Sequence, residues 1–203
     1  MTATTVRRAL ARSSATLLGT LLLWAPAVVA QEADRLVSDS SSAILPHSET
    51  PVIRAIRVSS SIQIDGMPDE AAWAAATPMT NFTQIDPFEG EPVSQPTDVR
   101  FLFDDDALYI GGRFYDSGPI MTRLARRDAG VSDSDLFTVS IDSHHDHQTS
   151  YRFTTNPSGI KRDATIASGS RGGGRGDSSW DPIWDVVSVV TDEGWFTEMR
   201  IPF

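Results

Sequence analysis

The chain carries short runs in which apolar and polar residues alternate, as they do in strands that bury one face. Residues 97–103 and 107–115 both alternate in this way, and three aspartates at 104–106 separate them. The apolar faces hold Val99, Phe101 and Phe103 in the first run and Leu108, Ile110 and Phe114 in the second. Polar residues between two alternating runs are typical of a turn, so the pattern predicts a β-hairpin.

Four more runs extend the strand pattern to the end of the chain. Residues 136–142 alternate through Phe137, Val139 and Ile141, residues 150–156 alternate through Tyr151 and Phe153, and residues 184–190 and 195–201 complete the series. Residues 68–76 form the only helical candidate, because Pro68 precedes a run of good helix formers. Many short strands separated by Gly, Pro and Asp predict an all-β fold: an antiparallel, jelly-roll-like β-sandwich with one short helix.

Two further segments precede the predicted domain. Residues 1–30 resemble a secretory signal peptide, with Arg7, Arg8 and Arg12 before an apolar run and small residues at 28–30. A transmembrane helix is the alternative, but the apolar run is short and Pro26 interrupts its end. Residues 31–51 are polar and serine-rich, which predicts a flexible leader. We therefore expect export to the periplasm, the outer membrane or the medium.

The predicted β-sandwich extends over residues 52–203. The chain stops at an apolar strand, so we expect that it is truncated at its C-terminal end.

Net charge limits the partners of the domain. Residues 1–30 hold three of the 17 basic residues and no acids, so the remainder has 14 basic and 27 acidic residues and a net charge of −13. This charge disfavours nucleic acid and anionic membranes. The chain contains no cysteine, so its core or a bound ion must stabilise it without disulfides.

Catalytic motifs are scarce in the sequence, and two sets of polar residues are candidates for binding a metal ion. Residues 142–148 contain three histidines, which suit a transition metal, but we interpret the cluster as a solvated hairpin loop. Carboxylate oxygens are ligands that calcium prefers, so four aspartates form a candidate site for structural calcium: Asp133, Asp135, Asp142 and Asp146. A pair of carboxylates could also serve a glycoside hydrolase, although no particular pair stands out.

Several stretches together resemble the family 9 carbohydrate-binding module. They are residues 62–73, 97–116, 126–128, 135–163, 180–186 and 194–203. The resemblance is to the version found at the N-terminus of exported bacterial proteins with a poorly characterised C-terminal β-domain. It implies a β-sandwich, often with structural calcium, that binds oligo- or polysaccharides without catalysis and is grouped with carbohydrate breakdown and O-glycosyl hydrolysis.

Trp180 and Trp184 are the main candidates for a sugar site. Sugars stack their apolar faces on exposed aromatic rings, and Trp180 follows a glycine-rich run and precedes an aspartate. Trp184 begins a strand-like run, so a place in the core is its alternative. We add Arg127, Asp128 and Asp116 as groups that bind hydroxyls, with a structural salt bridge as the alternative for Arg127 and Asp128.

Other large side chains are predicted to be structural. Trp73 on the short helix and Trp195 at the start of a strand are expected in the core. Glu198 lies on the strand face opposite Trp195, and if it is buried it needs a partner such as an arginine or an ion.

The sequence thus favours a non-catalytic carbohydrate-binding module of an exported protein. Part of a glycoside hydrolase is one alternative. The other is an envelope assembly domain that contacts its own C-terminal β-domain in the outer membrane.

Overall fold

The alternating runs form two β-sheets in the computed structural model, which describes residues 51–167 and 176–203. The predicted signal peptide and all but the last residue of the predicted leader lie outside the described residues. The elements are β1 (Ile56–Arg57), α1 (Ala71–Ala75), β2 (Thr97–Phe103), β3 (Ala107–Tyr115), β4 (Phe137–Ile141), β5 (Thr149–Thr155), β6 (Arg162–Ala167), β7 (Asp185–Thr191) and β8 (Gly194–Pro202). No helix in this part of the chain is long and apolar enough to cross a membrane.

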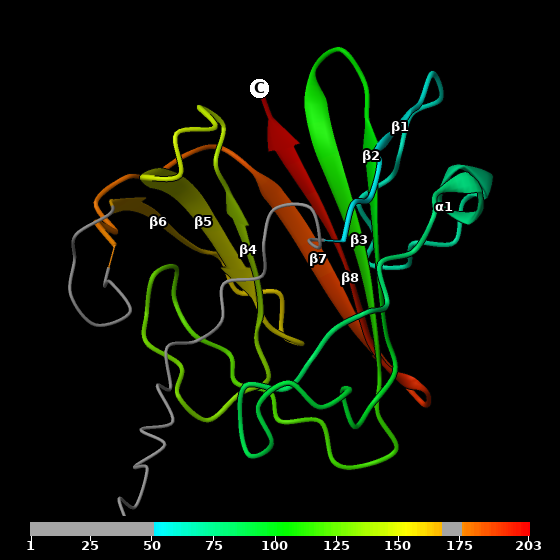
Figure 1. Ribbon diagram of the computed structural model, residues 1–203, viewed down its shortest axis with the longest axis vertical. Helices are drawn as coiled ribbons and strands as arrows, with labels where there is room; N and C mark the ends of the chain where they lie inside the picture. The colour runs from blue at the N-terminus through cyan, green and yellow to red at the C-terminus, as the bar shows by residue number, and fades with distance from the viewer. Residues whose placement is uncertain (1–50, 168–175) are drawn as a thin grey trace, which may run out of the picture. The chain divides into compact units, whose positions relative to one another are not determined.

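The two sheets face each other as a sandwich (Figure 1). One has five strands in the order β1-β2-β3-β8-β7, and the other has three in the order β4-β5-β6. Neighbouring strands are antiparallel except for the short pairing of β1 with β2, which is parallel. The predicted β-sandwich with one short helix is therefore confirmed.

Residues 104–106 make the turn that the sequence predicted between β2 and β3. The Oδ1 atom of Asp104 accepts backbone N–H bonds from Asp106 and Ala107, both at 2.8 Å, and Oδ2 accepts a bond from the Tyr109 hydroxyl at 2.8 Å. These donors favour the ionised carboxylate and lower the pKa of Asp104, chiefly through the Asp106 N–H group. The aspartate thus closes the hairpin with its own side chain.

The main hydrophobic core lies between the sheets. Cross-strand partners point to the same face of a sheet, so the observed registers decide which residues enter this core. Its buried members are Val99, Ile110, Phe137, Phe153, Trp184, Trp195, Met199 and Ile201. The apolar faces predicted from the alternation in β2, β3, β4 and β5 contribute to this cluster or pack against it, except for Phe103 at the end of β2, which lies under the Arg57 guanidinium group instead. The core position predicted for Trp195 is confirmed.

A second core covers the opposite face of the five-stranded sheet, where the chain from β1 to α1 lies against it (Figure 1). Trp73 on α1 is fully buried there, as predicted, together with Leu102 and Tyr109. Gly111 of β3 lies beneath the indole. A Cβ atom at this position would come within 3.0 Å of the Trp73 ring and 2.9 Å of Pro68. Glycine is thus needed for the close approach of α1 to the sheet.

Glu198 of β8 links this second core to the sheet. Its side chain is fully buried, and it accepts bonds from the Trp73 Nε1–H group and from the backbone N–H groups of Asp65 and Gly66, all at 2.9 Å. The partners of the buried carboxylate are therefore an indole and a turn, rather than the arginine or ion expected from the sequence. Desolvation raises the pKa of Glu198 to about 7, although the three donors oppose the shift.

We predict that Glu198 makes the domain less stable as the pH rises from about 4.5 to about 7. A carboxyl group whose pKa is higher in the folded state takes up a proton on folding, so its contribution is complete at low pH and is lost as the pH passes the folded pKa. From the model-compound value of 4.5 to a folded value of about 7, the loss is about 3 kcal/mol. Urea unfolding at a series of pH values measures it.

The Glu198→Gln variant is the control, because it cannot titrate. It should be about 1–3 kcal/mol less stable in acid, since the amide places an N–H group against one of the donors, and it should lack the loss between pH 4.5 and 7. An equal loss in both proteins would show that another group causes the pH dependence.

Candidate functional site

Residues 176–184 carry the chain from β6 of one sheet to β7 of the other (Figure 1). At its start, Asp177 pairs with Thr165 of β6 through two backbone bonds of 2.9 and 3.1 Å. At its end, β7 begins at Asp185. The segment therefore closes one side of the sandwich, and the two predicted tryptophan candidates lie on it.

Trp184 belongs to the core. Its residue is only 1% exposed, its ring meets Phe153 edge-on at 5.3 Å, and its Nε1–H group donates to Asp163 Oδ1 at 3.0 Å. A ring without an exposed face cannot stack on a sugar. The assignment of Trp184 to the binding site is therefore wrong, and the alternative core interpretation describes it.

Trp180 is half-buried and packs against the main core, with part of the residue accessible to solvent. Its centroid lies 4.7 Å from Tyr151 and 5.7 Å from Phe153, two β5 residues whose side chains point between the sheets. These contacts hold the indole in place from one side. Trp180 is thus a partly exposed aromatic residue supported by two other rings, which is a property that a stacking platform needs.

Arg127 contacts the segment that carries Trp180 and pairs with three aspartates. Its Nη2 atom lies 2.7 Å from Asp163 Oδ1, 2.6 Å from Asp181 Oδ1 and 2.8 Å from the Pro182 carbonyl. Its Nε atom lies 3.8 Å from Asp128. We refer to Arg127, Asp128, Asp163 and Asp181 as the Arg127 cluster. The cluster connects the Trp184 partner in the core with an aspartate that directly follows Trp180.

The three aspartates of the Arg127 cluster differ in the solvent exposure of their side chains. The Asp163 side chain is fully buried, and its Oδ2 atom has no hydrogen-bond partner among the described residues. Asp128 has a positive φ of 59° and accepts the Asp163 backbone N–H at 3.1 Å, so it holds the backbone of β6. The Asp181 side chain is 70% exposed. Of the three, Asp181 is best placed to meet a ligand.

Asp116 does not join the Trp180 site. It follows β3, where its N–H group bonds to Glu193 and its side chain accepts the Gly118 N–H at 2.6 Å. The neighbouring Phe114 packs on Phe137 at the start of β4, whereas Trp180 packs on Tyr151, which pairs with Ile141 at the end of β4. Asp116 and Trp180 therefore lie toward opposite ends of the sandwich.

The four aspartates proposed for calcium do not form one site. Asp133 pairs with Arg123, and Asp135 accepts the Met121 N–H group. Asp142 and Asp146 bond to backbone N–H groups within the β4–β5 loop, and these bonds lower the pKa of both carboxyl groups. β4 separates the two pairs by roughly 20 Å, because a strand rises about 3.3 Å per residue.

Histidine ligands do not complete a metal site either. His145 and His147 are exposed on the β4–β5 loop, as the solvated-loop interpretation expects. Within residues 51–167 and 176–203, no three histidine or carboxylate side chains are grouped so that they could hold a metal ion. Structural calcium stays a prediction, without a ligand set in the described part of the chain.

The sequence interpretation missed Asp163 and Arg152. An aspartate inside a strand, in register with Phe153 on the buried face, signals that a donor must meet it. Arg152 lies on the outer face of the three-stranded sheet near the hydrogen-bonded hydroxyls of Thr138 and Thr154, and its Nε atom is buried without a partner among the described residues. This outer face is a second polar surface that could meet a sugar.

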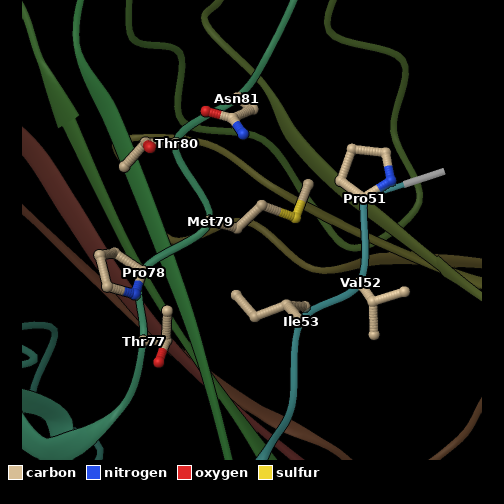
Figure 2. Close-up of a pocket in the computed structure, with 8 residues that line it drawn as sticks. All are labelled: Pro51, Val52, Ile53, Thr77, Pro78, Met79, Thr80 and Asn81. Carbon is tan, nitrogen blue, oxygen red and sulfur yellow. The ribbon is translucent and has the colours of Figure 1, made fainter. Parts of the chain in front are cut away.

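A pocket of about 200 Å³ lies elsewhere, between residues 51–53 and 77–81. Figure 2 shows the Met79 side chain pointing from the second segment toward the first. The lining residues include no aromatic and no charged side chain, so the pocket offers neither a stacking surface nor an ion pair. None of the predicted site residues lines it.

Comparison with known proteins supports the fold. No protein-family model matches the chain, and no curated protein matches its sequence. Two solved structures of a family 9 carbohydrate-binding module from Caldicellulosiruptor kristjanssonii are similar. The complex with glucose is 16% identical with a TM-score of 0.50, over 74% of this chain and 69% of that chain. The complex with cellotriose is 18% identical with a TM-score of 0.47, over 74% and 68%. The chain therefore has the fold of a family 9 carbohydrate-binding module.

Proposed function

We propose that this domain binds carbohydrate without catalysis, and that Trp180 is its stacking platform. The observation that carries the proposal is the partly exposed Trp180 ring, held by Tyr151 and followed by the exposed carboxylate of Asp181. The fold supports it, because a module with the same fold has been solved in complex with glucose.

Each part of the Trp180 site has a physical role in this proposal. The indole covers the apolar face of a sugar ring, and burial of that surface contributes to affinity. Asp181 accepts hydrogen bonds from sugar hydroxyls, and its ion pair with Arg127 restrains the carboxylate. Because the protein supplies these groups in one orientation, little conformational entropy is lost on binding.

The same geometry does not favour glycoside hydrolysis by the Arg127 cluster. Hydrolysis needs two carboxyl groups that both reach the glycosidic bond. Asp163 and Asp181 approach the same Arg127 nitrogen, but the side chain of Asp163 is fully buried and serves Trp184. We propose that the domain delivers an exported protein to its glycan, with residues 1–30 as the export signal.

We predict that Trp180→Ala weakens sugar binding about five- to tenfold. A sugar can cover only the exposed part of the half-buried ring, about 40–60 Å², which corresponds to roughly 1–1.5 kcal/mol. The variant should also lose about 1–3 kcal/mol of stability, because the ring packs on Tyr151 and Phe153. Calorimetry on an oligosaccharide panel that includes cello-oligosaccharides measures the binding, and circular dichroism verifies the fold.

Two matched variants locate the binding surface. Trp195→Phe changes a core ring that stacks on Phe114, away from the Arg127 cluster, and should destabilise the domain while leaving affinity unchanged. Arg152→Gln changes the outer face of the three-stranded sheet and should also leave affinity unchanged. If Arg152→Gln abolishes binding and Trp180→Ala has no effect, then the sugar binds on that face and the Trp180 assignment is wrong.

We further predict that the purified domain releases no reducing ends from plant, fungal or bacterial glycans. The expectation follows from the burial of Asp163. A reducing-sugar assay over extended incubation is the measurement, and Asp181→Asn is the comparison. Turnover in the parent that disappears in this variant would make the domain a hydrolase.

A further inference from the structure

We propose that the Trp180 site prefers saccharides with protonated amino groups, such as oligomers of 2-amino-2-deoxyglucose, over neutral and acidic saccharides. The inference rests on the proposed function and names the ligand class of the same site. It follows from the exposed carboxylate of Asp181, which directly follows Trp180 in the chain, and from the other carboxylates that share Arg127 with it.

The Arg127 cluster holds three carboxylates and one guanidinium group. Asp163 and Asp181 each lie within 2.7 Å of the same Arg127 nitrogen, and Asp128 lies 3.8 Å from another. One cation therefore faces three anions at short range. The buried Oδ2 atom of Asp163 receives no hydrogen bond from the described residues, so its charge is incompletely balanced.

The neighbouring cationic side chains, Lys161 and Arg200, pair with groups outside the Arg127 cluster. The Lys161 ammonium group donates to the Trp184 carbonyl, lies 5.6 Å from the centroid of its ring, and is 3.8 Å from Asp185. Arg200 reaches the same Asp185 at 4.0 Å. Lys161 and Arg200 add two positive charges near the cluster, and Asp185 adds one negative charge. The cluster together with these neighbours therefore carries one net negative charge.

A further aspartate precedes Trp180 on the same segment. The Asp177 side chain accepts the Ser179 N–H group at 2.9 Å, and its bonds to Ser179 lower the pKa of the carboxyl group. Asp177 therefore stays ionised in mildly acidic solution, where amino sugars carry a full positive charge. Aspartates thus flank Trp180 on both sides along the chain.

The exposed carboxylate of Asp181 provides a direct partner for a cationic sugar. Its Oδ1 atom binds Arg127, and its Oδ2 atom makes no hydrogen bond to the described residues. An ammonium group on a sugar that stacks on Trp180 can pair with this carboxylate and lies near the negative face of the indole. A sugar carboxylate or sulfate in the same position would meet like charge.

The test compares four short oligosaccharides of equal length: glucosamine, N-acetylglucosamine, glucose and galacturonate oligomers. Calorimetry is done with the purified chain at low ionic strength, well below the pKa of the sugar amine. We expect the glucosamine oligomer to bind about fivefold more tightly than its acetylated counterpart, as for a favourable exposed ion pair. The galacturonate oligomer should bind most weakly. The preference should shrink in 0.5 M salt, because screening weakens exposed charge pairs.

Asp181→Asn should reduce the preference to less than twofold while neutral oligomers still bind. Asp192→Asn is the matched control, because it removes the same charge from an exposed position in the β7–β8 turn and should retain the preference. Trp180→Ala tests whether the cationic oligomer uses the site or only the net charge of the chain. Arg171 and Arg175 lie outside the described residues and are left unchanged in every variant.

Each other outcome overturns the inference in a distinguishable way. Neutral and cationic oligomers that bind equally would refute the charge preference and leave the proposed function intact. Cationic binding that Trp180→Ala does not weaken would show non-specific attraction to an acidic protein. Failure of all four oligomers to bind would refute both proposals.

Discussion

The hydrogen bond from Trp184 to Asp163 connects the core of this protein to its candidate site. An indole buried between two sheets must find an acceptor for its N–H group, and β6 supplies a carboxylate. A buried carboxylate in turn needs a cation, which Arg127 provides. The same guanidinium group reaches Asp181 at the surface, so a requirement of the core extends to the residue that directly follows Trp180.

A second buried carboxylate solves a similar problem on the other side of the five-stranded sheet. Glu198 accepts bonds from a turn and from Trp73, and thereby holds the chain before β2 against the sheet. Its partners among the described residues are neutral donors, which do not offset the cost of burial, so desolvation raises its pKa. Asp163 instead has a cation that continues to the surface. The two carboxylates therefore have different effects. Glu198 links folding stability to pH, and Asp163, through Arg127, positions the exposed carboxylate of Asp181.

The proposed ligand preference depends on how the sandwich is closed. Residues 176–184 must cross between the sheets, and Trp184 anchors this crossing in the core. Trp180, four residues earlier, then reaches only the edge of the core and packs on Tyr151 with part of its ring exposed. Stacking surface and negative charge therefore occur together because one crossing segment carries both.

The sequence by itself determined six of the eight described strands, the hairpin at Asp104 and the core positions of Trp73 and Trp195, because period-two alternation and turn chemistry are local properties. It missed β1 and β6, whose short or polar runs lack that alternation. It predicted the ring platform at Trp180 but did not exclude Trp184, since both tryptophans have similar neighbours in the chain. Only the tertiary structure decided which ring is buried, and it separated the aspartates proposed for calcium along β4. Arg127 meets Asp163 and Asp181 from distant positions in the chain. Such contacts depend on strand order and register, which local patterns do not specify.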